Sequence, residues 1–300
     1  MRIKSIDMLR GIAVISMLFF QILDFVSNWF NLYNRHYIGT YFNWFSIFMV
    51  VSGFSLALMF RKYDSYTFLK RLVGRCLLLI GLGYFLISLV VHVQPFDEVL
   101  IGIGVSWFIL GLLKIATDYF FTDKKNRLIV YLAVMVLCLM LSMIMPFSFN
   151  PFWVLPFMLF GLIMFELGRN MKFPLFLGVV SFSVLGVFHN SIDYYSRTLP
   201  FFVLNVGVTS ILFVLMVLLE RNFIEFGDFL AYFGRNSLLF YFLHFGLIYS
   251  LFGEKVFPIG FDIAFTILSI FWLILIEKLL NQLRGLAKGR KFLKKLFIPR

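Results

Sequence analysis

The chain has 300 residues, of which 61% are hydrophobic and 14% charged, and it carries a net charge of +12. A mean hydropathy of +0.94 excludes an ordinary soluble globular domain. Apolar stretches of about twenty residues, long enough for a helix to cross a bilayer, recur along the whole length, whereas a membrane β-barrel would show short alternating segments. The sequence therefore predicts an all-α membrane helix bundle. Its basic residues lie in particular loops and not on one soluble face, which argues against nucleic-acid binding.

A hydropathy window of about 19 residues predicts about ten transmembrane helices. They cover residues 9–30, 38–60, 72–93, 99–120, 128–146, 151–168, 174–189, 199–219, 229–251 and 256–278. No linker or soluble insert interrupts them. We therefore expect one multi-pass domain in the cell membrane over residues 1–280, followed by a basic amphipathic tail over residues 281–300.

Lysine and arginine residues are distributed unequally between the two sets of loops. One set includes residues 61–75 and 124–127 and the tail, whereas the opposite set holds only Arg35, Arg197 and Lys255. The positive-inside rule therefore places both termini in the cytoplasm. Residues 61–75 interleave basic with apolar side chains, and two interpretations stay open for them: binding of anionic lipid, or binding of a phosphorylated ligand.

Several polar residues lie on the expected external side or in the outer half of a crossing. They are the four histidines His36, His92, His189 and His244, together with Asp24 and Asp262. Ionisable side chains are costly in lipid, so they are expected to face a polar pocket or one another. Histidine suits general-base chemistry because its pKa lies near neutrality. Solvated or interfacial histidines remain the alternative.

On the cytoplasmic side, Asp7 and Arg10 are one helical turn apart and can form an ion pair. Lys70, Arg71, Arg75 and Arg235 are expected near the same membrane face, where such a cluster can hold phosphates. The alternative is a set of ordinary positive-inside residues with an ion pair at a helix start.

Other site patterns are absent or isolated. The sequence has no P-loop or dinucleotide-binding glycine motif and no His/Cys spacing typical of zinc, so we expect neither ATP or dinucleotide chemistry nor a metal. Cys76 and Cys138 fall in different predicted helices, which makes a disulfide framework improbable on spacing. His92 and Asp97 match the His-x4-Asp pair of glycerolipid acyltransferases without its companion motifs.

Four segments resemble motifs of the transmembrane acyltransferase superfamily, in particular of the heparan-alpha-glucosaminide N-acetyltransferase-like family. They are SIDMLRGIAV at residues 5–14, FMVVSGFSL at 48–56, VLIGIGVS at 99–106 and GRNSLLFYFLH at 234–244. The segments occur in the family's order and span most of the chain. The resemblance implies transfer of an acetyl group from cytoplasmic acetyl-CoA to an acceptor on the far side of the membrane, typically an amino sugar or another glycan.

The resemblance and the pattern of polar residues together imply site residues. His36, the position similar to the family's histidine, is the expected general base or, as the alternative, a transient acetyl carrier, and Asp24 or His244 orients it or polarises the carbonyl. The residues expected to bind the donor are Asp7, Arg10, Arg235, Asn236, Ser237 and Tyr241 from the motifs, and Arg71 and Arg75 from the basic segment. The expected partners are acyl-CoA, a glycan acceptor and membrane lipids, and a homodimer stays open.

Two alternatives use the same helices without covalent chemistry. The first is a transporter or a flippase for a small or lipid-linked substrate, although inverted repeats and interrupted helices in matching halves are not evident. The second is a non-catalytic membrane scaffold, which Asp24 and Asp262 in apolar helices disfavour. Acyl-CoA-dependent transfer distinguishes the enzyme from both.

Overall fold

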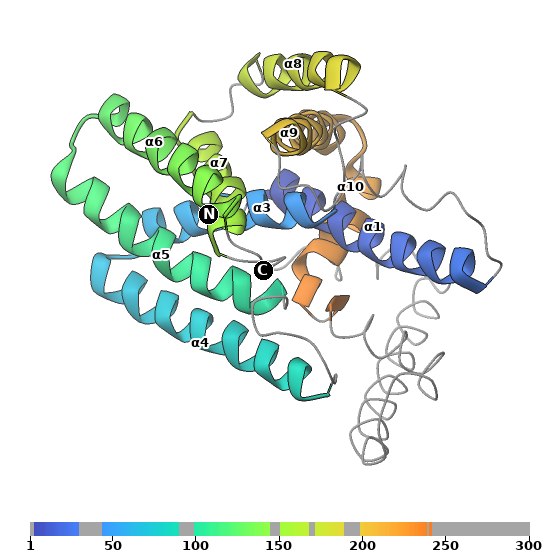
Figure 1. The fold of residues 1–300 in the computed structure, drawn as a ribbon, viewed down its shortest axis with the longest axis horizontal. Helices are drawn as coiled ribbons and strands as arrows, with labels where there is room; N and C mark the ends of the chain where they lie inside the picture. The colour runs from blue at the N-terminus through green and yellow to red at the C-terminus, as the bar shows by residue number, and fades with distance from the viewer. Residues whose placement is uncertain are drawn as a thin grey trace.

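The computed structural model describes residues 3–29, 44–89, 99–144, 151–167, 172–188, 199–238 and 240–241, with only the backbone at residues 18–29, 44, 86–89, 99, 182 and 184–188. Within these ranges the chain forms nine helices and no strand, which confirms the all-α prediction there (Figure 1). The helices are α1 (Lys4–Trp29), α3 (Trp44–Lys62), α4 (Ser65–Leu89), α5 (Val99–Phe120), α6 (Lys124–Ser142), α7 (Pro151–Leu167), α8 (Lys172–Phe188), α9 (Leu199–Asn222) and α10 (Ile224–Arg235).

Among the described residues, four helices are long and apolar enough to cross a membrane. The crossing segments are Phe45–Lys62, Leu100–Phe120, Lys124–Ser142 and Leu199–Asn222, while α7 and the first part of α8 are apolar but shorter. Each of the four overlaps a crossing that the sequence predicts. The total of about ten crossings and the orientation of the termini stay predictions, and both the last predicted crossing and the basic tail lie outside the described residues.

Several helices differ from their predicted bounds, and two of the differences concern predicted site residues. Helix α4 begins at Ser65, seven residues before the predicted crossing, so the basic segment forms its first turns. Helix α10 ends at Arg235, and Asn236 caps it with a backbone N–H bond to the carbonyl of Tyr232, within the predicted crossing 229–251. Apolar and polar residues alternate at the start of α4 and at the end of α10. A hydropathy window of about 19 residues averages over such alternation, so it does not detect either boundary.

Helix α7 forms the centre of the bundle. Its residues from Trp153 to Met164 are buried all round the helix, and α3, α5, α6 and α9 pack against it. A helix that is apolar on every side is stable only when it is enclosed. Helix α7 is therefore the surface on which the other helices are positioned.

Helices α3 and α7 touch through their backbones. A methyl group at Gly53 would overlap the carbonyl of Met158, and one at Gly161 would overlap the carbonyl of Val50. Small residues allow such close approach in membrane bundles, where van der Waals packing rather than the hydrophobic effect holds helices together.

We expect Gly161→Ala to destabilise the protein, because the new methyl group must push α3 and α7 apart. Overpacking of this kind costs about 1–3 kcal/mol, which lowers the thermal midpoint by several degrees, on the order of 5 °C. Gly74→Ala on α4 is the matched control, since nothing lies within 4 Å of the added atom. Thermal unfolding in detergent measures both, and equal midpoints would contradict the backbone contact.

Candidate functional site

The crossing of α1 and α10 brings together the two motif segments that lie farthest apart in the sequence. A methyl group at Gly11 would overlap the carbonyl of Leu230, and one at Gly234 would overlap the carbonyl of Asp7. Figure 1 shows the two helices crossing beside α3. Steric fit therefore explains why each motif has a glycine at this position: without a side chain there, the other helix can approach to backbone contact.

Polar contacts fix the start of α1 at this crossing. The Lys4 ammonium lies 2.8 Å from an Asp228 oxygen and donates to the carbonyl of Ile224 at 3.1 Å. The backbone N–H of Ser5 donates to Glu220 Oε2 at 3.1 Å. A carboxylate at the first turn also complements the positive end of the helix dipole. The first turn of α1 is thus held by the end of α9 and the start of α10.

Arg10 joins a third motif segment to the crossing. Its Nη2 donates to Ser55 Oγ on α3 at 2.7 Å, and its Nη1 lies 3.8 Å from Asp7 Oδ1. Asp7 is 7% exposed, and the Arg10 side chain is 23% exposed. The predicted Asp7–Arg10 pair is therefore confirmed as a contact, and Ser55 is an additional partner that the sequence analysis did not assign.

The residues at the end of α10 and just after it follow directly from the α1–α10 crossing. Gly234 touches α1, so Arg235 and Asn236 follow directly after the point of contact. The Asn236 side chain donates to the carbonyl of Tyr232 at 3.0 Å, and Ser237 is half-buried. Tyr241 is buried at 7% exposure. The structure thus places these four predicted donor-site residues on one short segment beside the Asp7–Arg10 pair.

Other predicted site residues are not joined to this crossing. Arg71 and Arg75 lie on α4, which packs mainly against α5, and their described ring contacts are with Tyr63 and Trp107 and not with α1. The predicted catalytic residues His36 and His244 lie outside the described residues, as does the side chain of Asp24. Their roles stay predictions.

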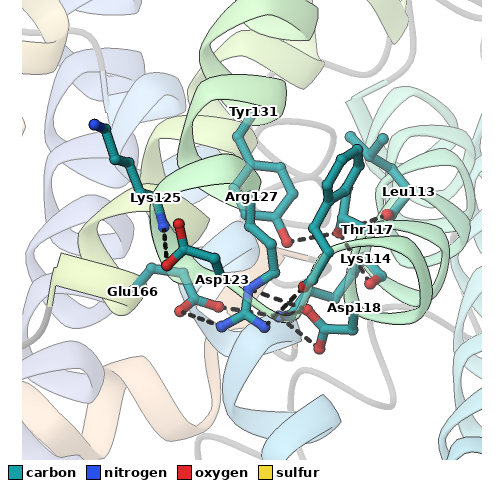
Figure 2. Close-up of polar contacts among 10 residues, drawn as sticks. Leu113, Lys114, Thr117, Asp118, Asp123, Lys125, Arg127, Tyr131 and Glu166 are labelled. Carbon is teal, nitrogen blue, oxygen red and sulfur yellow. Dashed lines mark hydrogen bonds and ion pairs between the residues drawn. The ribbon is translucent and has the colours of Figure 1, made fainter.

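A buried group of charged side chains lies where α5, α6 and α7 meet, and the sequence analysis missed it (Figure 2). The Lys114 ammonium, on a residue that is 4% exposed, lies 2.7 and 2.9 Å from the two oxygens of Asp118. It also donates to Glu166 Oε1 at 2.9 Å and lies 5.1 Å from the ring centre of Phe60 on α3. One cation thus connects α5 to α7 and contacts α3.

Helix α6 supplies the rest of this group, which we call the buried charge network. Arg127 Nε lies 3.5 Å from Asp118 Oδ1, and Arg127 Nη2 lies 4.0 Å from Glu166 Oε2. Tyr131 Oη and Thr117 Oγ1 share a hydrogen bond of 2.8 Å beside them. Two cations balance two carboxylates, so the buried charge network carries no net charge and fits a structural role.

A signal for the buried charge network was present in the sequence. Lys114 and Asp118 stand four residues apart inside a predicted crossing, and Glu166 stands inside another. Ionisable residues within apolar helices are costly unless they find partners. The sequence analysis applied this rule to the external half of the bundle and not to these three residues.

The comparison with protein families covers nearly the whole chain. The profile of an acyltransferase-domain family matches residues 3–278. The chain belongs to this acyltransferase family. No curated protein matches the sequence. The match and the apolar helices confirm the coarser part of the sequence prediction, an acyltransferase in a membrane protein.

The described part of this acyltransferase offers no metal centre. No group of three His, Cys, Asp or Glu side chains in the described ranges is arranged to hold a metal ion. Cys76 on α4 and Cys138 on α6 are both buried free thiols. Neither cysteine belongs to the α1–α10 crossing or to the buried charge network.

Lys114→Met should destabilise the acyltransferase, because Asp118 and Glu166, with side chains 24% and 11% exposed, would keep only Arg127 as a described cationic partner. Breaking a fully buried ion pair from one side costs about 3–5 kcal/mol, and the partial exposure of these carboxylates places the expected cost at or below the low end of that range. Lys124→Met, which removes an exposed lysine at the start of α6, is the control and should cost under about 0.5 kcal/mol. The thermal unfolding midpoint of each variant is measured in detergent. A midpoint of Lys114→Met close to that of Lys124→Met would show that the buried charge network contributes little to stability.

Proposed function

We propose that this acyltransferase takes an acetyl group from acetyl-CoA on the cytoplasmic side and transfers it to an amino sugar or another glycan on the opposite side. The observation that carries the proposal is the meeting of three motif segments at the α1–α10 crossing, around Arg10 and Ser55. The family match over residues 3–278 supports acyl transfer as the reaction. The heparan-alpha-glucosaminide N-acetyltransferase-like motifs support the donor and the acceptor class.

In this proposal the α1–α10 crossing holds the phosphates of the donor. The Arg10 guanidinium is fixed by Ser55 and Asp7, so little side-chain entropy remains to be lost on binding. A guanidinium binds phosphate oxygens by charge-assisted, often paired hydrogen bonds. Arg235 and Asn236 follow directly after Gly234 and supply a second cation and an amide on the other helix.

The transfer itself needs a base for the acceptor and a path for the leaving group. The nitrogen or oxygen of the acceptor forms a bond to the thioester carbonyl carbon, and His36 accepts the proton that this amine or hydroxyl loses. The carbon–sulfur bond then breaks, and CoA leaves as a thiolate that takes up the proton. Asp24 or His244 orients His36 or polarises the carbonyl.

The Arg10→Ala variant should bind acetyl-CoA at least about 10-fold more weakly than the wild type, because hydrogen bonds to charged groups contribute about 1.5–3 kcal/mol. Isothermal titration calorimetry of the purified protein in detergent measures this. Lys124→Ala removes an exposed cation at the start of α6 and should leave the affinity unchanged. Equal affinities of wild type and Arg10→Ala would remove Arg10 from the donor site.

The His36→Ala variant should lose acetyl transfer by at least about 100-fold, the usual size of a general-base contribution. Its affinity for acetyl-CoA should remain that of the wild type, because the proposed donor site uses Asp7, Arg10 and the end of α10 and not His36. Transfer at the wild-type rate would show that another group accepts the proton. Movement of a labelled substrate across proteoliposomes without any acyl-CoA would favour a transporter.

A further inference from the structure

In the part of the chain that the structure describes, the basic side chains at the start of α4 lack the carboxylate partners that four other cations have. Lys4 and Arg10 at the α1–α10 crossing, and Lys114 and Arg127 in the buried charge network, each form an ion pair. Lys70, Arg71 and Arg75 are exposed, and no carboxylate in the described ranges forms an ion pair with any of them. The start of α4 therefore carries a positive charge that the described protein does not neutralise.

Two of these cations are held on aromatic rings. The Arg71 guanidinium carbon lies 4.1 Å from the ring centre of Tyr63, and that of Arg75 lies 5.7 Å from Trp107. Trp107 is 8% exposed, so its ring is a fixed support. A cation–π contact uses the flat face of the guanidinium and leaves its N–H edge available for an anion.

The nearest carboxylate in the sequence is already engaged. Asp64 Oδ2 accepts a hydrogen bond from the backbone N–H of Thr67 at 3.0 Å, at the beginning of α4. This bond holds the pKa of Asp64 below its usual range. Asp64 caps the helix and does not pair with the cations that follow it.

An open apolar track continues from the basic residues along α4. Lys70, Gly74, Leu77 and Gly81 stand at i, i+4, i+7 and i+11, and so share one face of the helix. Nothing lies within 4 Å of an atom added at either glycine, and Leu77 is 65% exposed. Figure 1 shows α4 at the edge of the helix bundle, beyond α5.

We infer that α4 binds one anionic phospholipid of the cytoplasmic leaflet, with its phosphate at Arg71 and Arg75 and one acyl chain along the neighbouring face at Gly74 and Gly81. Arg71 and Arg75 each follow a residue of the track by one position, about 100° round the helix. Arg75 lies three residues inside the predicted crossing 72–93, about 5 Å along the helix from its start. A basic residue at that level is near the lipid head groups, where it attracts anionic lipid. The site takes a lipid and not the acyl donor, because α4 lies at the edge of the bundle and packs mainly against α5, where Arg75 stacks on Trp107, whereas α1 packs mainly against α10 (Figure 1).

The test is native mass spectrometry of the protein in a neutral detergent, titrated with phosphatidylglycerol and, separately, with phosphatidylcholine of the same acyl chains. We expect the wild type to bind one phosphatidylglycerol about 10-fold or more tightly than phosphatidylcholine. The double variant R71Q/R75Q should bind phosphatidylglycerol about 10-fold more weakly, with phosphatidylcholine binding unchanged. K124Q/K125Q removes the same charge from exposed residues of α6 and should change the affinity less than about 2-fold.

A third variant tests the acyl-chain track without touching a charge. Gly81→Leu fills open space and improves helix propensity, so the protein should fold normally. It should weaken phosphatidylglycerol binding several-fold, and wild-type affinity would remove the track from the site. Equal losses in R71Q/R75Q and K124Q/K125Q would show diffuse surface charge and no site. Loss of acetyl-CoA binding in R71Q/R75Q, with phosphatidylglycerol binding intact, would assign the two arginines to the donor instead.

Discussion

Backbone contact between α1 and α10, at Gly11 and Gly234, is the constraint on which the candidate site depends. Any side chain at these two positions would separate the helices and move Asp7 and Arg10 away from the end of α10. The contact also explains why two motifs more than 200 residues apart both contain a glycine next to an arginine. Close packing through glycine is the ordinary means of helix association in membranes, and here it also brings charged groups together.

The same helices carry their charges in three different ways. At the α1–α10 crossing, Arg10 pairs with Asp7 and bonds to Ser55, and its side chain keeps partial exposure. In the buried charge network, Lys114 is surrounded by carboxylates and is almost fully buried. On α4, Arg71 rests on an aromatic ring and is exposed. The partly exposed Arg10 fits the proposed site for the donor's phosphates, and the compensated Lys114 fits a structural role. The exposed Arg71 on its aromatic ring fits the proposed lipid site.

The sequence allowed much of this to be predicted, for physical reasons that differ between regions. Long apolar stretches predicted the helices, because a chain in lipid must satisfy its backbone hydrogen bonds internally. The spacing of Asp7 and Arg10 predicted their contact, since one helical turn fixes it. The Arg10–Ser55 bond and the Gly11–Gly234 contact could not be derived in the same way, because they depend on how helices distant in the sequence cross. The buried charge network was within reach, since Lys114 stands in an apolar helix, but its partner Glu166 comes from another helix. His36, His244 and the side chain of Asp24 lie outside the described residues, so the base in this account comes from the resemblance alone.

The most direct test of the account follows labelled acetyl groups in membranes that contain the natural acceptors. Inside-out membrane vesicles from cells that express the protein are supplied with tritiated acetyl-CoA on the exposed cytoplasmic face, and the label in the glycan fraction is counted. The account predicts incorporation with the wild type and its loss with Arg10→Ala expressed at the same level. Equal incorporation in vesicles with the wild type, with Arg10→Ala and without the protein would contradict it.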